Sequence, residues 1–175
     1  MDLLAREMPA ASAEAEARRE FELKFGEVSR SAFLLARHLG RDTDAARDVV
    51  QEAALRAWRY RSSRAGDFRP WFLAIVYRLC RGPMPDWLPL PRTWDRPAPD
   101  PIESAMDSEL VTALRSLAPR QRAALWLRYC DDLATAEVAL ILHCTETAAK
   151  QLLLRARDAL RERLRSEEEM TSEIY

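Results

Sequence analysis

The 175 residues include 48% hydrophobic and 31% charged side chains, a balance typical of folded proteins and unlike that of disordered chains. The net charge of −1 gives no overall attraction to a polyanion, so a nucleic-acid surface would have to be local. The N-terminus does not look like a signal peptide and no stretch approaches the ~20 apolar residues of a membrane span, which predicts a cytoplasmic protein without membrane insertion.

Cysteine and histidine are too sparse to indicate a metal site. Cys80, Cys130 and Cys144 are odd in number and have no close pairing, which favours reduced, structural thiols. His38 and His143 complete no metal-ligand spacing. We therefore expect no metal and no cofactor.

Composition and proline distribution predict an all-α fold in two domains. Ala, Leu, Arg and Glu dominate, only four glycines occur, and Val, Ile and Thr are thinly spread. Seven of the ten prolines lie between Pro83 and Pro101, a density that no helix interior tolerates. The expected segments are an N-terminal helical or flexible extension (1–19), a first domain (20–82), a Pro-rich linker (83–105), a second domain (106–165) and an acidic tail (166–175). Because Pro-rich segments are semi-rigid spacers, we expect the two domains to be held apart rather than packed into one core, with Trp87 and Trp94 docking on a domain or a partner.

The first domain is expected to begin with an amphipathic helix. Apolar residues recur there every three or four positions, at Phe21, Phe25, Val28, Ala32, Leu35 and Leu39. Gly40 is expected to end this helix in the left-handed conformation, and Asp42 or Thr43 to cap the next one.

The second helix, residues 44–60, is expected to have two distinct faces. Its buried face comprises Ala46, Val49, Val50, Ala53 and Ala57. At ~100° per residue, the opposite face comprises Asp48, Gln51, Glu52, Leu55 and Arg59.

An arginine-rich turn leads into the third helix. From residue 56 to residue 81 the chain has one acid, Asp67, and a local charge of +6, with arginines at Arg56, Arg59, Arg61, Arg64, Arg69, Arg78 and Arg81. Such a concentration of guanidinium groups favours contact with phosphates. The third helix is expected to start near Phe68, with Pro70 in its first turn, and to stop at Gly82. Its expected apolar seam is Trp71, Ile75 and Leu79.

The second domain is expected to contain a helix-turn-helix. Residues 110–117 and 123–130 form two short helices, the second entered at Pro119. A helix over 135–142, a tight turn over 143–145 and a helix from Glu146 to about Arg163 follow. Thr145 caps the last helix, whose inner seam is Ala149, Leu153, Ala156 and Leu160.

Taken in order, these segments resemble the extracytoplasmic-function group of bacterial sigma factors. In the first domain the resemblance lies in residues 44–58 (DAARDVVQEAALRAW) and 68–76 (FRPWFLAIV). In the second it lies in residues 114–122 (LRSLAPRQR) and 137–139 (EVA), and in Lys150 and Arg155–Arg157 of the recognition helix. Both halves in this order across a linker are more specific than either motif alone.

The resemblance implies that core RNA polymerase is a partner. In the family, the acidic and amide residues of the first motif dock on a coiled coil of the polymerase clamp, which implies this role for Asp48, Gln51 and Glu52. Leu55 shares their exposed face and is added to the predicted polymerase-binding set.

The resemblance also implies that promoter DNA is bound by both domains. The loop and third helix are expected to bind and open the minus-ten element through Tyr60, Arg61, Arg64, Arg69 and Arg78, whereas Trp71 is assigned to the core. The last helix is expected to enter the major groove at the minus-thirty-five element, with Glu146, Thr147, Lys150 and Gln151 on base edges and Arg155 and Arg157 gripping phosphates or packing.

Several residues depart from the family pattern and keep alternatives open. His143 stands where the family usually has a turn glycine, and Leu152 stands where it has an arginine that faces the DNA groove. Loss of this arginine weakens or alters the expected readout of the minus-thirty-five element. One alternative is a degenerate sigma-like adaptor or inhibitor that binds polymerase or a partner without opening DNA. A stand-alone helix-turn-helix repressor is disfavoured by the lack of a dimerisation helix, and no constellation of catalytic residues indicates an enzyme. Many relatives are controlled by an anti-sigma factor, which is a further possible partner.

Overall fold

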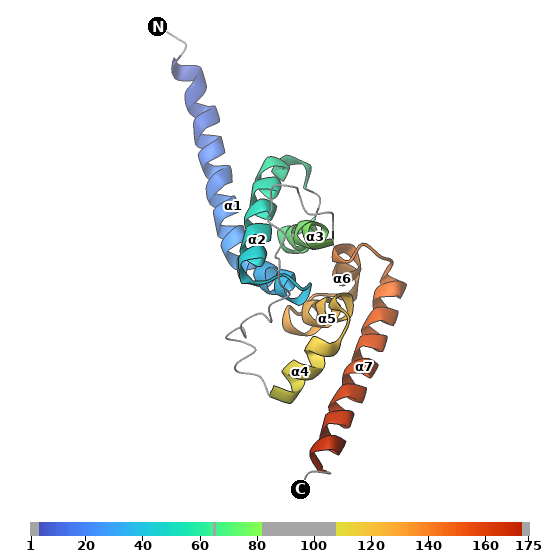
Figure 1. Cartoon of the computed structure of the whole chain (residues 1–175). Helices are drawn as coiled ribbons and strands as arrows, with labels where there is room; N and C mark the ends of the chain where they lie inside the picture. Colours follow the sequence, from blue (N-terminus) through green and yellow to red (C-terminus); the bar gives the residue numbers. More distant parts are fainter. Residues whose placement is uncertain (1–3, 65, 82–107, 173–175) are drawn as a thin grey trace.

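The computed structural model describes residues 4–64, 66–81 and 108–172, and all regular elements among them are helices. The first half contains α1 (Leu4–His38), α2 (Thr43–Arg59), a 3₁₀ turn η1 (Arg61–Ser63) and α3 (Phe68–Arg81). The second contains α4 (Ser108–Ser116), α5 (Pro119–Leu125), a π-helical turn η3 (Trp126–Cys130), α6 (Thr135–Ile141) and α7 (Glu146–Ser172) (Figure 1). The all-α prediction is confirmed. The expected linker, with Trp87 and Trp94, lies outside the described residues, within which no helix is long and apolar enough to cross a membrane.

α1 is longer than predicted and ends where predicted. It starts at Leu4, so the expected extension is continuous with the first helix of the domain. Gly40 has a φ of +91°, which glycine adopts without the Cβ strain of other residues. The amides of Gly40 and Arg41 donate to the carbonyls of Arg37 and Ala36 at 2.9 and 3.1 Å, which satisfies carbonyls that the helix end leaves open.

α2 has the two faces that its sequence predicts. The Asp42 carboxylate accepts a hydrogen bond from the amide of Ala45 at 2.8 Å, so Asp42 rather than Thr43 caps the helix. The buried residues are Ala45, Ala46, Val49, Val50, Ala53 and Ala57. Small side chains along this face let α2 lie close to α1 and α3, which both pack against it.

α3 is apolar on more than one side. Phe72, Leu73 and Val76 are fully buried, whereas the predicted seam of Trp71, Ile75 and Leu79 is only partly buried and packs around that core. The predicted seam was therefore displaced from the main buried face. A helix that is hydrophobic nearly all round needs partners on both sides.

The second half departs from its predicted helices at η3. Pro119 opens α5, as expected. The continuous helix predicted over 123–130 instead widens at Trp126, where the amide of Asp131 donates to the carbonyl of Trp126 at 3.1 Å, five residues back. Leu127 is buried, but Cys130, placed in the predicted helix, is exposed.

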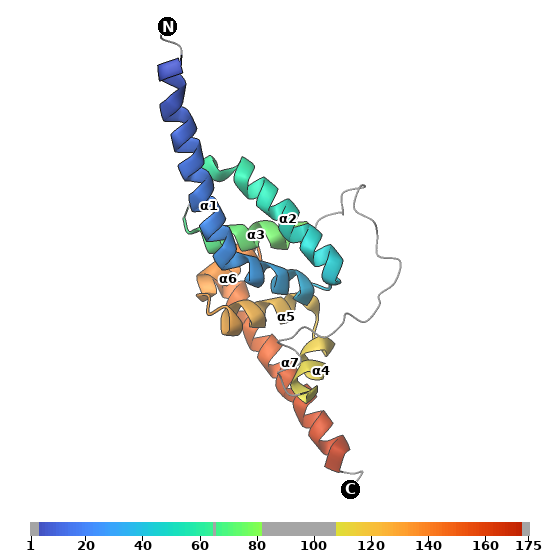
Figure 2. The ribbon, with the colours of Figure 1, turned by 90° about the vertical axis from the view of Figure 1, so that its left-hand side faces the viewer.

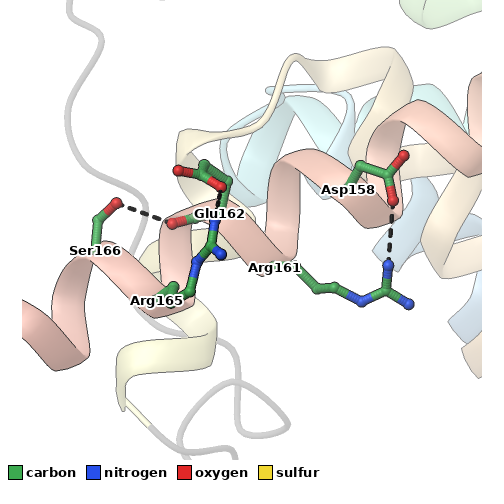
Figure 3. Close-up of polar contacts among 5 residues, drawn as sticks. All are labelled: Asp158, Arg161, Glu162, Arg165 and Ser166. Atoms are coloured by element: carbon green, nitrogen blue, oxygen red, sulfur yellow. Dashed lines mark hydrogen bonds and ion pairs between the residues drawn. The ribbon is translucent and has the colours of Figure 1, made fainter.

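α6 and α7 form the predicted helix-turn-helix. Thr145 Oγ1 accepts from the amide of Ala148 at 3.2 Å and so caps α7. Ala149, Leu153 and Ala156 are buried, as expected. α7 continues to Ser172, beyond the predicted end near Arg163. Figure 3 shows side-chain contacts on α7 where this extension begins, with Arg161 bound to Asp158, Arg165 bound to Glu162, and the Ser166 hydroxyl donating to the Glu162 carbonyl.

The two halves pack together, and the expectation that they would be held apart was wrong. α6 lies against α3 and α5 lies against α1, so one hydrophobic core runs through both halves. Figures 1 and 2 both show α6 beside α3. Packing follows from the two-sided apolar surface of α3, because one of its sides would otherwise face water.

Candidate functional site

The outer face of α2 presents the residues predicted to bind polymerase. Asp48 and Gln51 are exposed, and the Leu55 side chain is 59% exposed. Glu52 is half-buried, and its carboxylate accepts from Arg56 Nε at 2.6 Å. This face therefore offers a carboxylate, an amide and an apolar side chain to a partner, while a second carboxylate is fixed by its neighbour.

The end of α2 presents an aromatic ring beside a stacked guanidinium. Tyr60 is 55% exposed. Arg61 lies over the Trp58 ring, 3.9 Å from its centre, and also pairs with Glu14 of α1 at 2.8 Å. Two groups suited to an unpaired base, one aromatic and one guanidinium, thus lie next to each other along the chain. Arg61 is already engaged with an acid of α1.

Arg64 lies in the turn before α3 with little direct pairing. Its guanidinium is 5.8 Å from the centre of the Phe68 ring. The charge of Arg64 also lowers the pKa of Glu20, but less than the hydrogen bond from Lys24, which is the main cause of that lowering. Arg64 therefore remains available for a phosphate.

Arg69 and Arg78 occupy the two ends of α3, and both contact the second half. Arg69 Nη2 donates to Asp131 Oδ1 at 2.9 Å. Arg78 Nε donates to His143 Nε2 at 2.9 Å. Two of the five residues predicted to contact the minus-ten element are thus engaged by groups from beyond the linker.

The start of α7 presents most of the predicted groove-reading residues. Glu146, Thr147, Lys150 and Gln151 are all exposed, and Lys150 pairs with Glu146 at 2.7 Å. Arg155 is exposed as well. Arg157, although exposed, lines a cavity of about 490 Å³ between α1, α4, α5, η3 and α7, which suits packing better than phosphate contact.

The departures from the family pattern have structural counterparts. His143 has a φ of +50°, the left-handed conformation that favours glycine, so the turn keeps its shape at a cost in strain. Leu152 is partly buried against the core rather than exposed to a groove. Leu154 is 55% exposed and adds an apolar side chain to the surface of α7.

Neither Cys80 nor Cys130 has the lowered pKa of a reactive thiol. Burial raises the pKa of Cys80 to about 11, outweighing the nearby Arg41 guanidinium. Burial and then the Asp131 carboxylate raise the pKa of Cys130. Among the described residues no group of three or more His, Cys, Asp or Glu side chains is placed to hold a metal ion.

Sequence reasoning missed Asp131, a residue that joins the two halves. It is buried, and its Oδ1 accepts from the Ser31 hydroxyl at 2.7 Å as well as from Arg69. No local pattern distinguishes it from the exposed Asp132 beside it. A signal for the packing itself existed in the unbroken apolar run of residues 71–77, which is too long for one helix face.

Comparison with known proteins adds two family matches, one in each half. Sigma-70 region 2 matches residues 26–81, and sigma-70, region 4 matches residues 107–160. The first match contains the outer face of α2 and all of α3, and the second contains the helix-turn-helix.

Two curated relatives are extracytoplasmic-function (ECF) sigma factors. The chain is 32% identical over 150 residues to the ECF RNA polymerase sigma factor SigG of Mycobacterium tuberculosis (strain ATCC 25618 / H37Rv), covering 66% of this chain and 40% of SigG. It is 34% identical over 131 residues to SigJ of the same organism, covering 66% and 42%. The chain thus spans about two fifths of the length of these relatives.

Solved structures share the fold. The chain superposes on CnrH in complex with the cytosolic domain of CnrY with a TM-score of 0.67 and 21% identity, covering 91% of this chain and 97% of the other. It superposes on the sigma factor RpoE in complex with the anti-sigma factor NepR from Bartonella quintana with a TM-score of 0.58 and 20% identity, covering 86% and 97%. At these identities the likeness concerns the fold alone.

Proposed function

This chain belongs to the extracytoplasmic-function sigma factors, and we propose that it binds bacterial core RNA polymerase and directs promoter recognition, melting and transcription initiation. In this proposal residues 20–82 bind polymerase and the minus-ten element, and residues 106–165 bind the minus-thirty-five element. The protein then acts in the cytoplasm as a specificity subunit without catalytic chemistry of its own. An anti-sigma factor is a further proposed partner, as one of the solved relatives is bound to one.

The outer face of α2 is the observation that carries the proposal. Asp48, Gln51 and Leu55 are exposed on the side opposite a row of buried small residues. Exposed acids on a helix are commonly only solvated, but these occupy the positions of the family's docking motif within the matched region 2. A partner with basic and amide groups fits this face.

Charge reversal on this face tests the proposal. We expect Asp48→Arg with Glu52→Arg to weaken binding of core polymerase by at least about tenfold, measured by titrating labelled protein with purified core enzyme. The matched control is Asp158→Arg with Glu162→Arg, a second pair of acids four residues apart on an exposed helix. Both variants should show native helical circular dichroism. If the α2 variant folds and still binds core like the control, the proposal is wrong.

The adaptor alternative keeps one supporting observation, because Arg69 and Arg78, although exposed, each donate a hydrogen bond to a residue of the second half. Promoter-dependent transcription separates the two functions. A sigma factor gives a transcript with core enzyme, and replacing Arg61, Arg64 and Arg69 with glutamine should abolish opening while core binding persists. An adaptor gives no transcript from any candidate promoter even before these replacements.

A further inference from the structure

The cavity that Arg157 lines has a largely aliphatic wall. Its volume of about 490 Å³ falls within the roughly 300–1,000 Å³ of small-molecule pockets. α1 lines it from the first half, and α4, α5, η3 and α7 line it from the second, where α4 and α5 both pack against α7 (Figures 1 and 2). The aliphatic side chains of the wall are Leu34, Leu110, Val111, Leu114, Leu125 and Leu160. Such a wall suits the hydrocarbon part of a ligand, because burial of apolar surface is favourable.

The charged groups of the cavity lining are all cationic. Four arginines line it, Arg37, Arg115, Arg122 and Arg157, and no aspartate or glutamate of the described residues does. Arg122 is oriented by backbone carbonyls, because its Nε donates to that of His38 at 3.0 Å and its Nη1 to that of Arg115 at 3.1 Å. These two bonds hold the guanidinium without cancelling its charge. A lining of this kind favours an anionic group on the ligand.

Two residues of the lining bring unused hydrogen-bond donors. The Arg157 side chain makes no hydrogen bond or ion pair within the part of the chain that the structure describes. Trp126 Nε1 is buried and has no acceptor among those residues, although the Trp126 ring lies against that of His38 with the centres 4.4 Å apart. A buried donor without an acceptor costs free energy that an acceptor on a ligand recovers. Oxygen acceptors at one end and hydrocarbon at the other are the features of an amphiphilic carboxylate.

We propose that this cavity binds a fatty acid. The carboxylate binds Arg157, whose exposed side chain stands at the solvent side of the cavity, and the hydrocarbon tail lies among the leucines of α4, α5 and α7. The ligand contacts both halves of the folded chain, so its binding stabilises the fold. This site goes beyond the proposed function and does not depend on it, because the ligand is neither polymerase nor DNA.

Displacement of a fluorescent analogue measures the binding. The native chain is titrated into a dansyl-labelled undecanoic acid below the concentration at which that acid forms micelles, and the label is then displaced by dodecanoate, dodecanol or butyrate. We expect saturable binding, with dodecanol at least about tenfold weaker than dodecanoate because it offers no charge to Arg157. Butyrate should fail to displace the label, because it has too little hydrocarbon to bury.

Arg157→Gln tests the carboxylate end of the site. Because Arg157 is exposed, the variant should keep its native helical circular dichroism and bind dodecanoate about tenfold more weakly, with binding of dodecanol unchanged. Arg163→Gln is the matched control, since Arg163 is another exposed and unpaired arginine of α7 within the described residues but does not line the cavity. Val111→Trp fills the hydrocarbon end and should weaken binding of both ligands at least about tenfold.

The Cys130 thiol locates the ligand. Cys130 is exposed and lines the cavity, whereas Cys144 lies outside the lining. Saturating dodecanoate should slow alkylation of Cys130 by iodoacetamide severalfold and leave that of Cys144 unchanged, as mass spectrometry can show. Equal protection of both thiols, or of neither, contradicts a ligand in this cavity.

Three further results overturn the proposal. They are the lack of saturable binding by the native chain, equal displacement by dodecanol and dodecanoate, and equal affinity of Arg157→Gln and its control. The rival occupant is the chain's own segment over residues 83–105, in which Trp87 and Trp94 were expected to dock. If the label binds only after both tryptophans are replaced with alanine, the cavity belongs to that segment and is not a fatty-acid site.

Discussion

Replacing Phe72 with alanine is expected to destabilise the protein by about 3–5 kcal/mol, the usual cost of removing a buried aromatic ring. The Phe72 side chain is fully buried at the centre of the first half. The centre of its ring lies 5.7 Å from that of Phe25 on α1 and 5.6 Å from that of Phe68 at the start of α3. Removing the Phe72 ring therefore removes contacts with both helices. Total stabilities are about 5–15 kcal/mol, so the loss takes a large part of the whole.

Urea denaturation followed by far-ultraviolet circular dichroism measures this loss. The midpoint should fall while the slope of free energy against urea stays the same, because the same surface is exposed on unfolding. Leu23→Ala is the control, because Leu23 is apolar like Phe72 but lies on α1 and is 72% exposed. This replacement should change stability by about 0.5 kcal/mol or less. A Phe72→Ala loss no larger than that of the control would refute the assignment of Phe72 to the core.

Two further predictions concern titratable groups. The pKa of His143 lies below its ordinary value of 6.5, first through desolvation and then through Arg78. The unfolded chain therefore binds a proton more readily than the folded one, so the His143 contribution is complete above about pH 6.5 and is lost as the pH falls from there through the lower folded pKa. Melting temperatures from pH 8 to pH 5 should fall more for the native chain than for His143→Asn, and equal slopes would contradict this. The Cys80 thiol, with a pKa of about 11, should resist iodoacetamide at pH 8 until the protein unfolds, while the exposed Cys130 is labelled in the native state. Mass spectrometry locates the label, and equally fast labelling of both thiols would be inconsistent with the partial burial and raised pKa of Cys80.

Local features of the fold were predictable because local chemistry determines them. The spacing of Ala46, Val49 and Ala53 places them on one face of α2, and Gly40 and Asp42 end one helix and begin the next through contacts within a few residues. The length of α1 was not predictable, because its first turns carry no apolar stripe that distinguishes a projecting helix from a flexible extension.

Long-range features were not predictable from the same patterns. Proline density around the linker suggested separated halves, but it says nothing about the affinity of one half for the other. Asp48 could be identified as exposed because helical periodicity places it outward, whereas Lys150 was found through its match to the family's recognition helix. Asp131 could not, because its partner Arg69 is 62 positions away and nothing in the spacing links the two.

The wide turn η3 sets the direction of the Asp131 carboxylate. Its backbone is underwound relative to an α-helix, since one additional residue occupies the turn that ends at Asp131. One residue corresponds to about 100° of rotation around a helix axis. Engineering this segment toward ideal helicity would therefore swing the carboxylate round the axis and away from α3. The contact between Arg69 and Asp131 would then be lost, although neither residue had been replaced.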